Sequence, residues 1–153
     1  MEIPRGLTHV EYLRIQLEAV LPYLRLFEEE YGKEAVQVLL EKKLGERMGK
    51  ALATEAVEAD FDREVQKLES YRSEDALEYE ITKHDSEGLE FNVTRCAYVD
   101  LLEELGARDL GYLLVCGHDF PEAIEDGMVL SRSKTCMQGD GICDFRYRRR
   151  ERR

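Results

Sequence analysis

The sequence predicts an α+β fold, in which a helical N-terminal half packs on a mostly antiparallel sheet of about four strands with inserted helices. Two observations support this prediction. Apolar residues recur every three or four positions up to about Tyr71, and beyond that point they alternate with polar residues. The 153 residues suffice for one ordinary core, and no linker or repeat divides them. We therefore expect a single domain over residues 1–153.

Charge and composition exclude several classes of function. With 22 basic and 33 acidic residues, the net charge is −11, which repels phosphate backbones, so no nucleic-acid partner is expected. No apolar run reaches the roughly 18 residues of a membrane span. No apolar segment follows Met1, so a secretory signal is not expected, and we predict a cytoplasmic protein with reduced cysteines. The basic tail, residues 147–153, is expected to be a frayed, solvated terminus.

The first predicted helix occupies most of residues 1–31. Thr8 and Glu11 have the spacing of a capping box, and Gly32 is placed to end the helix. Pro22 is expected to kink the helix or to split it near Leu21. The stripe favours a core-facing helix, with a homodimer through this helix as the alternative; its members are Val10, Leu13, Leu17, Val20, Leu24, Phe27 and Tyr31.

Two further helices are predicted before the sheet. The second helix runs from about Lys33 to about Glu58. Within it, Gly45, Gly49 and Ala53 are spaced by four, which predicts close approach of another backbone. A third, short helix from about Asp60 to Tyr71 carries an apolar stripe of Phe61, Val65 and Leu68.

Hairpins and short helices make up the second half. Residues 77–82 and 89–94 alternate apolar with polar positions around a turn at 85–88, which predicts a β-hairpin. A second hairpin is expected from Val129–Thr135 and Ile142–Arg148, with a turn at 139–141. Between the hairpins, helical segments are expected at Ala97–Leu105, at Leu110–Val115 and from Pro121 to about Gly127.

The four cysteines could pack, bind metal or react. None forms a Cys-x-x-Cys pair, so the signature of a structural zinc site is missing and no metal is predicted. A scattered zinc site built from Cys116, His118 or Asp119 with Cys143 stays open as an alternative. Cys136 is interpreted as a small core residue.

Cys116 and Cys143 have the more suggestive surroundings. A nucleophilic thiol needs a neighbouring base or positive charge, and His118 follows Cys116 closely, although it could equally be a loop residue facing water. Asp119 could supply a carboxylate or simply cap the next helix. By strand alternation Cys143 shares a face with Phe145 and Tyr147, so it faces the core if they do.

Three motif blocks carry a family resemblance. Asn92–Cys96, Cys116–Asp119 and Gly139–Tyr147 resemble the L-2-amino-thiazoline-4-carboxylic acid hydrolase family, in which a cysteine after a strand, a Cys-x-x-Asp and a Gly-x-x-x-Cys-Asp-Phe segment recur. The resemblance covers roughly residues 32–148. The last block also resembles the small-molecule-binding domain called 4-vinyl reductase, which indicates fold more than activity.

The resemblance implies a hydrolase that opens a small carboxylated cyclic amidine at a C–N bond, towards cysteine, without a cofactor. A thiolate or a carboxylate-activated water would attack the ring carbon between sulfur and nitrogen. The alternative is a non-enzymatic module that binds a small molecule or zinc. The implied catalytic residues are Cys116, Asp119, Cys143 and Cys96, with His118 at an unspecified motif position as a proton carrier, and Arg95 or Arg132 for the substrate carboxylate.

Overall fold

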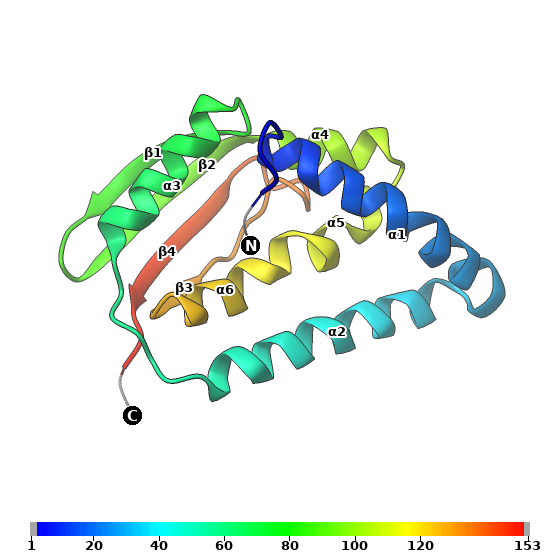
Figure 1. Ribbon diagram of the computed structural model, residues 1–153, viewed down its shortest axis with the longest axis horizontal. Helices are drawn as coiled ribbons and strands as arrows, with labels where there is room; N and C mark the ends of the chain where they lie inside the picture. Colours follow the sequence, from blue (N-terminus) through cyan, green and yellow to red (C-terminus); the bar gives the residue numbers. More distant parts are fainter. Residues whose placement is uncertain (1–2, 152–153) are drawn as a thin grey trace.

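The computed structural model describes residues 3–151 and confirms the α+β prediction (Figure 1). Its sheet is antiparallel throughout, with the strand order β1-β2-β4-β3. Both predicted hairpins are therefore present, and β4 returns to lie between β2 and β3. The strands are β1 (Leu77–His84), β2 (Gly88–Cys96), β3 (Met128–Ser131) and β4 (Cys143–Arg149).

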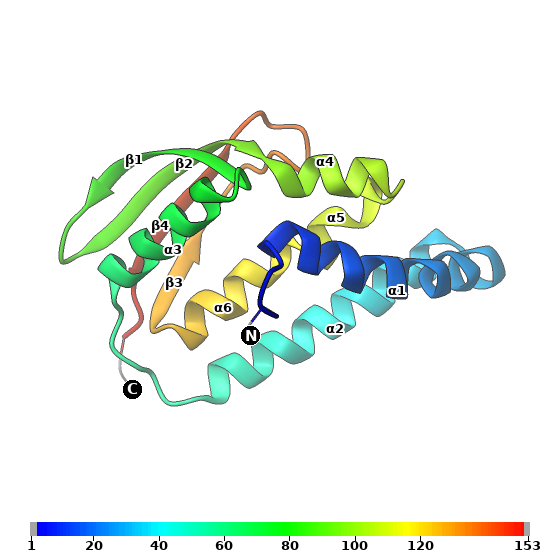
Figure 2. The same cartoon turned by 45° about the horizontal axis from the view of Figure 1, so that its top comes forward.

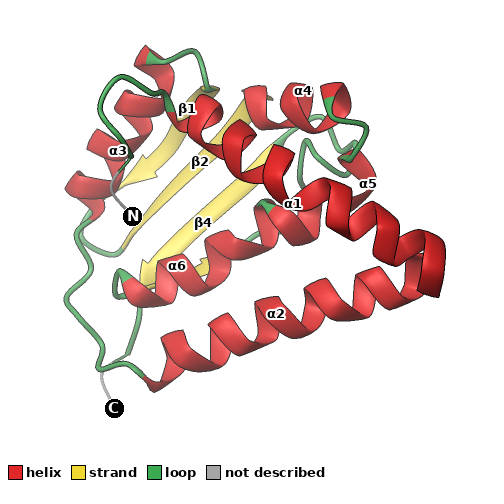
Figure 3. Cartoon of the chain, turned by 45° about the vertical axis from the view of Figure 1, so that its right-hand side comes forward, coloured by secondary structure: helices red, strands yellow, loops and turns green. Residues whose placement is uncertain are grey.

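One face of the sheet carries a hydrophobic core. Phe91 on β2 lies opposite Phe145 on β4, and Leu89 lies opposite Tyr147, so alternate residues of both strands point to the same side. The helices α3 (Phe61–Ser73) and α6 (Asp119–Glu125) flank this face (Figure 3). Cys143 belongs to the same core, as its alternation with Phe145 and Tyr147 predicts.

A second core joins the remaining helices. α1 (His9–Tyr31) and α2 (Lys33–Ala53) form an antiparallel pair that packs on α4 (Ala97–Glu104) and α5 (Arg108–Leu114). α2 runs along α6 on the side away from the sheet (Figure 1). α6 therefore lies between the sheet, whose core it joins through Ala123, and α2.

The start of α1 is as predicted, and its middle differs in detail. Thr8 and Glu11 form a complete capping box. Pro22 lies inside one continuous helix, so the predicted split is wrong; buried side chains on both sides, Leu21 and Leu24, hold the helix in place. Val20, which the sequence places on the apolar stripe, is 39% exposed, because Leu21 is the residue that faces the core.

α2 departs from the sequence prediction in two ways. It ends at Ala53 rather than near Glu58, because Thr54 turns to an extended conformation and its hydroxyl donates to the Ala51 carbonyl at 2.6 Å. The extended segment that follows leads to buried residues at the start of α3. No atom lies within 4 Å of a Cβ built on Gly45 or Gly49, so the predicted close approach of another backbone is wrong. These glycines lie on an exposed face of α2.

The basic tail is structured where the model describes it. Tyr147 to Arg149 end strand β4, and Arg150 donates to the carbonyls of Leu52 at 3.0 Å and Ile124 at 3.4 Å. The backbone N–H of Arg150 also donates to Gly127 at 2.8 Å. The prediction of a frayed tail is wrong over 147–150, because these groups satisfy carbonyls at the ends of α2 and α6. Residues 152–153 of that prediction lie outside the described part.

The surface bears on two further predictions. Across residues 3–151, no helix combines the length and the hydropathy that crossing a bilayer would need. Leu17 of α1 is buried, while Ile15, Tyr23 and Leu26 are more than half exposed. The predicted homodimer through α1 stays a proposal, and its contact surface would be this outer face.

Candidate active site

A buried ion pair links the start of α6 to the segment after β3. Arg132 Nη1 donates to Asp119 Oδ2 at 2.6 Å, and Arg132 Nη2 donates to the Cys116 carbonyl oxygen at 2.7 Å. The Arg132 side chain is 2% exposed, whereas that of Asp119 is 34% exposed. The arginine is therefore enclosed and fixed, and it holds one carboxylate oxygen of Asp119 while part of the carboxylate stays accessible.

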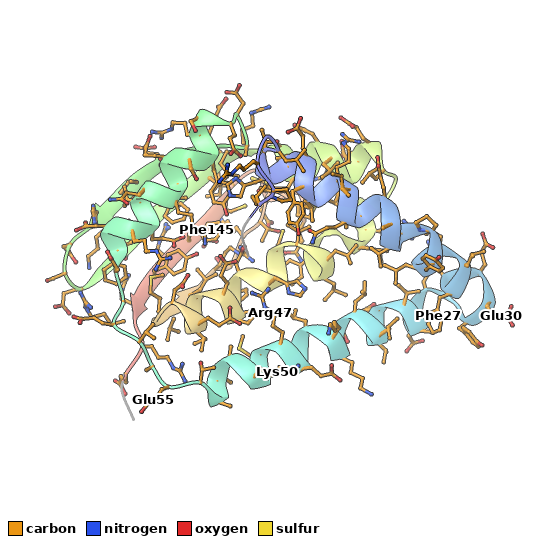
Figure 4. All side chains as sticks on the ribbon, viewed as in Figure 1. Phe27, Glu30, Arg47, Lys50, Glu55 and Phe145 are labelled. Atoms are coloured by element: carbon orange, nitrogen blue, oxygen red, sulfur yellow. The ribbon has the colours of Figure 1, made fainter. Side chains whose placement is uncertain are left out.

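Two aromatic rings complete the enclosure of Arg132. The guanidinium carbon lies 4.8 Å from the ring centre of Phe145 and 5.2 Å from that of Phe120, both within cation–π range. Phe145 lies on the core face of the sheet, between α3 and α6 (Figure 4). Burial raises the pKa of Asp119 and the Arg132 guanidinium opposes that rise. A carboxylate with a raised pKa is a better general base at neutral pH.

Asp119 does not cap the following helix, as one sequence interpretation had it. It is the first residue of α6, and no side chain caps that helix. Its carboxylate is turned to Arg132 instead. The alternative interpretation, a carboxylate available for chemistry, is the one that fits this geometry.

The thiols of the motif blocks come together near this pair. Cys143 Sγ accepts a hydrogen bond from the backbone N–H of Cys136 at 3.2 Å. Cys96 and Cys136 pack against the same hydrophobic core as Cys143, and Cys116 borders the helical core beside it. The thiols of Cys96 and Cys143 also act electrostatically on that of Cys116. Cys136, interpreted from sequence as packing alone, is thus part of the thiol cluster.

All three predicted cysteines carry protonated thiols near neutral pH. Burial raises the pKa of Cys116 to about 12, with Asp119 adding to the rise. Burial also raises the pKa of Cys143 to about 12 and that of Cys96 to about 11. Since a nucleophilic cysteine requires a lowered pKa, this environment favours thiols that donate protons over thiolates that attack.

An open cleft of about 450 Å³ lies beside the thiols, and we call it the outer cleft. Arg95 and Arg108 line it together with Cys96 and Cys136. The loop between β3 and β4 borders it, next to α4 at one end of the sheet (Figure 2). Arg108 fixes this loop by donating to the carbonyls of Met137 and Cys136, each at 3.0 Å. Arg95 is 46% exposed and donates to a backbone carbonyl at 3.1 Å.

His118 points away from the thiol cluster. Its Nδ1 lies 3.0 Å from Arg47 Nη1 of α2, and the ring also hydrogen-bonds the backbone of Leu113. Figure 4 shows Arg47 in the space between α2 and α6. Burial and the Arg47 charge lower the pKa of His118, so the ring is neutral at physiological pH. The structure therefore gives His118 a packing role between helices and does not bring it to the predicted reaction centre.

Sequence reasoning missed Glu64 and Tyr147 as site residues. The Glu64 charge raises the pKa of Tyr147, and the Asp119 charge raises the pKa of both residues. A signal for Glu64 exists in the sequence, because it falls on the apolar stripe of α3, three residues after Phe61 and four before Leu68. We call Glu64, Asp119, Arg132 and Tyr147 the inner polar cluster.

Within the described residues, no group of three or more His, Cys, Asp or Glu side chains is arranged to hold a metal ion. The scattered zinc site left open by the sequence is therefore not formed by residues 3–151.

A family model described as L-2-amino-thiazoline-4-carboxylic acid hydrolase matches residues 12–147. The chain belongs to the L-2-amino-thiazoline-4-carboxylic acid hydrolase family. The match includes all three motif blocks and begins within α1, well before the residues that carry the sequence resemblance. No curated protein matches the chain. In this member of the hydrolase family, the motif residues Cys116 and Asp119 meet at Arg132, which lies outside the three blocks.

Proposed function

We propose that the protein hydrolyses a small carboxylated cyclic amidine of the 2-amino-thiazoline-4-carboxylate kind, with Asp119 as the general base. Family membership supports hydrolysis of this substrate class. The observation that carries the assignment is the arrangement of Asp119, whose Oδ2 is fixed by a fully buried arginine while the side chain stays one-third exposed. A base must be oriented and yet reachable by water, and this carboxylate meets both conditions.

The proposed reaction consumes one water molecule. Asp119 takes a proton from water as the water oxygen bonds to the ring carbon between sulfur and nitrogen. The bond from this carbon to the ring nitrogen then breaks, and the proton held by Asp119 passes to the departing nitrogen. The product is a cysteine skeleton with a free amine and a carbamoyl group on sulfur.

The thiols support this reaction as neutral groups. A thiolate mechanism would first have to ionise thiols whose pKa is raised to about 12, as for Cys116 and Cys143. Cys116, whose backbone carbonyl is bound to Arg132, is proposed to donate from its protonated thiol the second proton that the departing nitrogen takes up. The thiol regains a proton from the hydroxyl on the attacked carbon as the carbonyl forms. Arg132 acts as a positioning residue, because its donors are already committed to Asp119 and Cys116. Arg95 at the outer cleft is left as the proposed partner of the substrate carboxylate.

The test compares D119N with E125Q. Glu125 is an exposed carboxylate on the same helix, paired with Arg47 of α2, and serves as the control. With 2-amino-thiazoline-4-carboxylate, mass spectrometry should show a wild-type product heavier by one water. We expect D119N to lower kcat at least roughly 100-fold and E125Q to leave it unchanged.

Thermal unfolding of both variants separates loss of the base from loss of the fold. Full activity in a folded D119N protein would refute the assignment of the base. Binding of the thiazoline by wild type without any turnover would instead support the small-molecule-binding module.

A further inference from the structure

Glu64 on α3 is a buried carboxylate that no other described residue hydrogen-bonds. The residue is 8% exposed, and its nearest cation, Lys67 Nζ, lies 3.9 Å from Oε2, beyond hydrogen-bond reach. That ammonium group hydrogen-bonds Glu122 of α6 instead. Burial of a carboxylate without hydrogen bonds is unfavourable, so this position is suited to a partner that brings its own donors.

Tyr147 on β4 carries a second buried polar group, on which the Glu64 charge acts. The residue is 6% exposed, and no other described residue hydrogen-bonds its hydroxyl. Glu64 and Asp119 both act electrostatically on it. In residues 3–151, every side-chain nitrogen or oxygen sealed from solvent has a hydrogen-bond partner. The Tyr147 hydroxyl and the Glu64 carboxylate therefore border space that a water-sized group can reach.

The charges around Glu64 select a cation. The charges that act on it are one ammonium group, Lys67, and three carboxylates, those of Glu122, Asp126 and Asp119, the last of which is paired with Arg132. Together with Glu64 itself, four acids face two bases, so the local potential is negative.

We propose that Glu64 and Tyr147 bind the amidinium group of the substrate. A protonated cyclic amidine is planar and carries three N–H donors, one on the ring nitrogen and two on the exocyclic nitrogen. Glu64 accepts one donor from each nitrogen in a bidentate pair, and the Tyr147 oxygen accepts the third. Asp119, on helix α6, belongs to the same inner polar cluster and acts electrostatically on Glu64. This inference rests on the proposed substrate class, and it adds the residues that recognise it.

The experiment measures binding by calorimetry in a D119N background, which prevents turnover. Two probes differ only at the group in question: 2-amino-thiazoline-4-carboxylate, and 2-oxothiazolidine-4-carboxylate, in which a carbonyl replaces the amidine. We expect E64Q to weaken binding of the amidine roughly 10- to 100-fold and binding of the carbonyl analogue less than about 3-fold. Y147F should weaken binding of the amidine by a smaller factor, on the order of 3- to 10-fold.

The control is E69Q, which removes an exposed carboxylate from the same helix and should bind both probes as its parent does. Equal weakening of both probes by E64Q, or no weakening of either, overturns the recognition role. So does a parent protein that binds neither probe.

Hydrolysis is judged separately, by turnover of the amidine by wild type. Selective loss of amidine binding in E64Q together with an inactive wild type supports recognition and refutes hydrolysis. An active wild type together with an E64Q variant that keeps its affinity for the amidine supports hydrolysis and refutes recognition by Glu64.

Discussion

Two arginines, one in each part of the site, are held in opposite ways. Arg132 in the inner polar cluster is 2% exposed and neutralised by a carboxylate. Arg108 at the outer cleft is 38% exposed, and two of its contacts are to backbone carbonyls of the loop that it fixes. Water screens the second arrangement and is excluded from the first, so equal changes in charge should have unequal effects.

The difference suggests a division of labour. The charges of the inner polar cluster are buried, where desolvation lowers the stability of the fold. Buried charges of this kind are typical of functional sites. The outer cleft keeps its arginines solvated, which suits the capture of an anion from solution. The thiols of Cys96 and Cys136 line the outer cleft and also pack on the inner core, so they form the boundary between the two.

The largest expected effect comes from replacing each arginine by methionine. R132M leaves Asp119 without its buried partner, and we expect the free energy of unfolding to fall by about 3 kcal/mol. R108M loses hydrogen bonds at a solvated position and should cost about 1 kcal/mol. Urea unfolding of both variants measures the comparison. Equal losses would mean that the two arginines do not differ as their burial indicates.

E64Q is expected to change the free energy of unfolding by a smaller amount and in the opposite direction, towards greater stability. Burial raises the pKa of Glu64, aided by the charges of Glu122, Asp126 and Asp119 and opposed by Lys67. The folded state thus binds this proton more tightly than the unfolded chain, where the pKa is about 4.3. Ionised Glu64 therefore lowers stability, increasingly so as pH rises from about 4.3 through the raised folded value.

E64Q should consequently be more stable than wild type at about pH 7, and this advantage should vanish below about pH 4. Thermal unfolding across this pH range checks the prediction. E69Q, whose carboxylate is exposed, should show no such gain. A pH-independent difference between E64Q and wild type would contradict the assigned desolvation of Glu64.

The smallest effect on stability is expected from R95A at the outer cleft. Arg95 is 46% exposed, so the free energy of unfolding should change by less than about 0.5 kcal/mol. If Arg95 binds the substrate carboxylate, as proposed, KM for 2-amino-thiazoline-4-carboxylate should rise about 10-fold with kcat little changed. Steady-state kinetics with the decarboxylated 2-amino-thiazoline provide the control, because R95A should not alter its KM. An unchanged KM for the acid would remove Arg95 from the site.

Local signals in the sequence were sufficient for much of the fold. The capping box at Thr8, the alternation of β1 and β2 and the start of α3 at Asp60 each depend on a few neighbouring residues, and all are present. The choice of Leu21 over Val20 for the core depends on where α2 and α4 lie, which short-range spacing does not contain. The prediction of a close helix contact at the exposed glycines of α2 was wrong for the same reason. Their spacing shows that another backbone could approach, but not that one does.

The candidate site divides similarly. The motif blocks pointed to Cys116 and Asp119, and Arg132 was expected to bind substrate rather than to pair with Asp119. Glu64 was missed because a single acid on a highly charged helix resembles a solvated residue. Only the packing of α3 against the sheet and α6 shows that this acid is buried. His118 was predicted to act beside Cys116 because the two are close in sequence. Closeness in sequence does not determine the direction of the ring, which points to Arg47.

Arg150 has a consequence for the order in which the molecule folds. This residue satisfies carbonyls in the last turn of α2, which ends about a hundred positions earlier, and it also reaches the end of α6. A contact across so long a stretch of chain costs loop-closure entropy before it contributes stability, so it forms after the local turns of both helices. The last turn of α2 is therefore closed by a late, long-range contact rather than by its own neighbours in sequence.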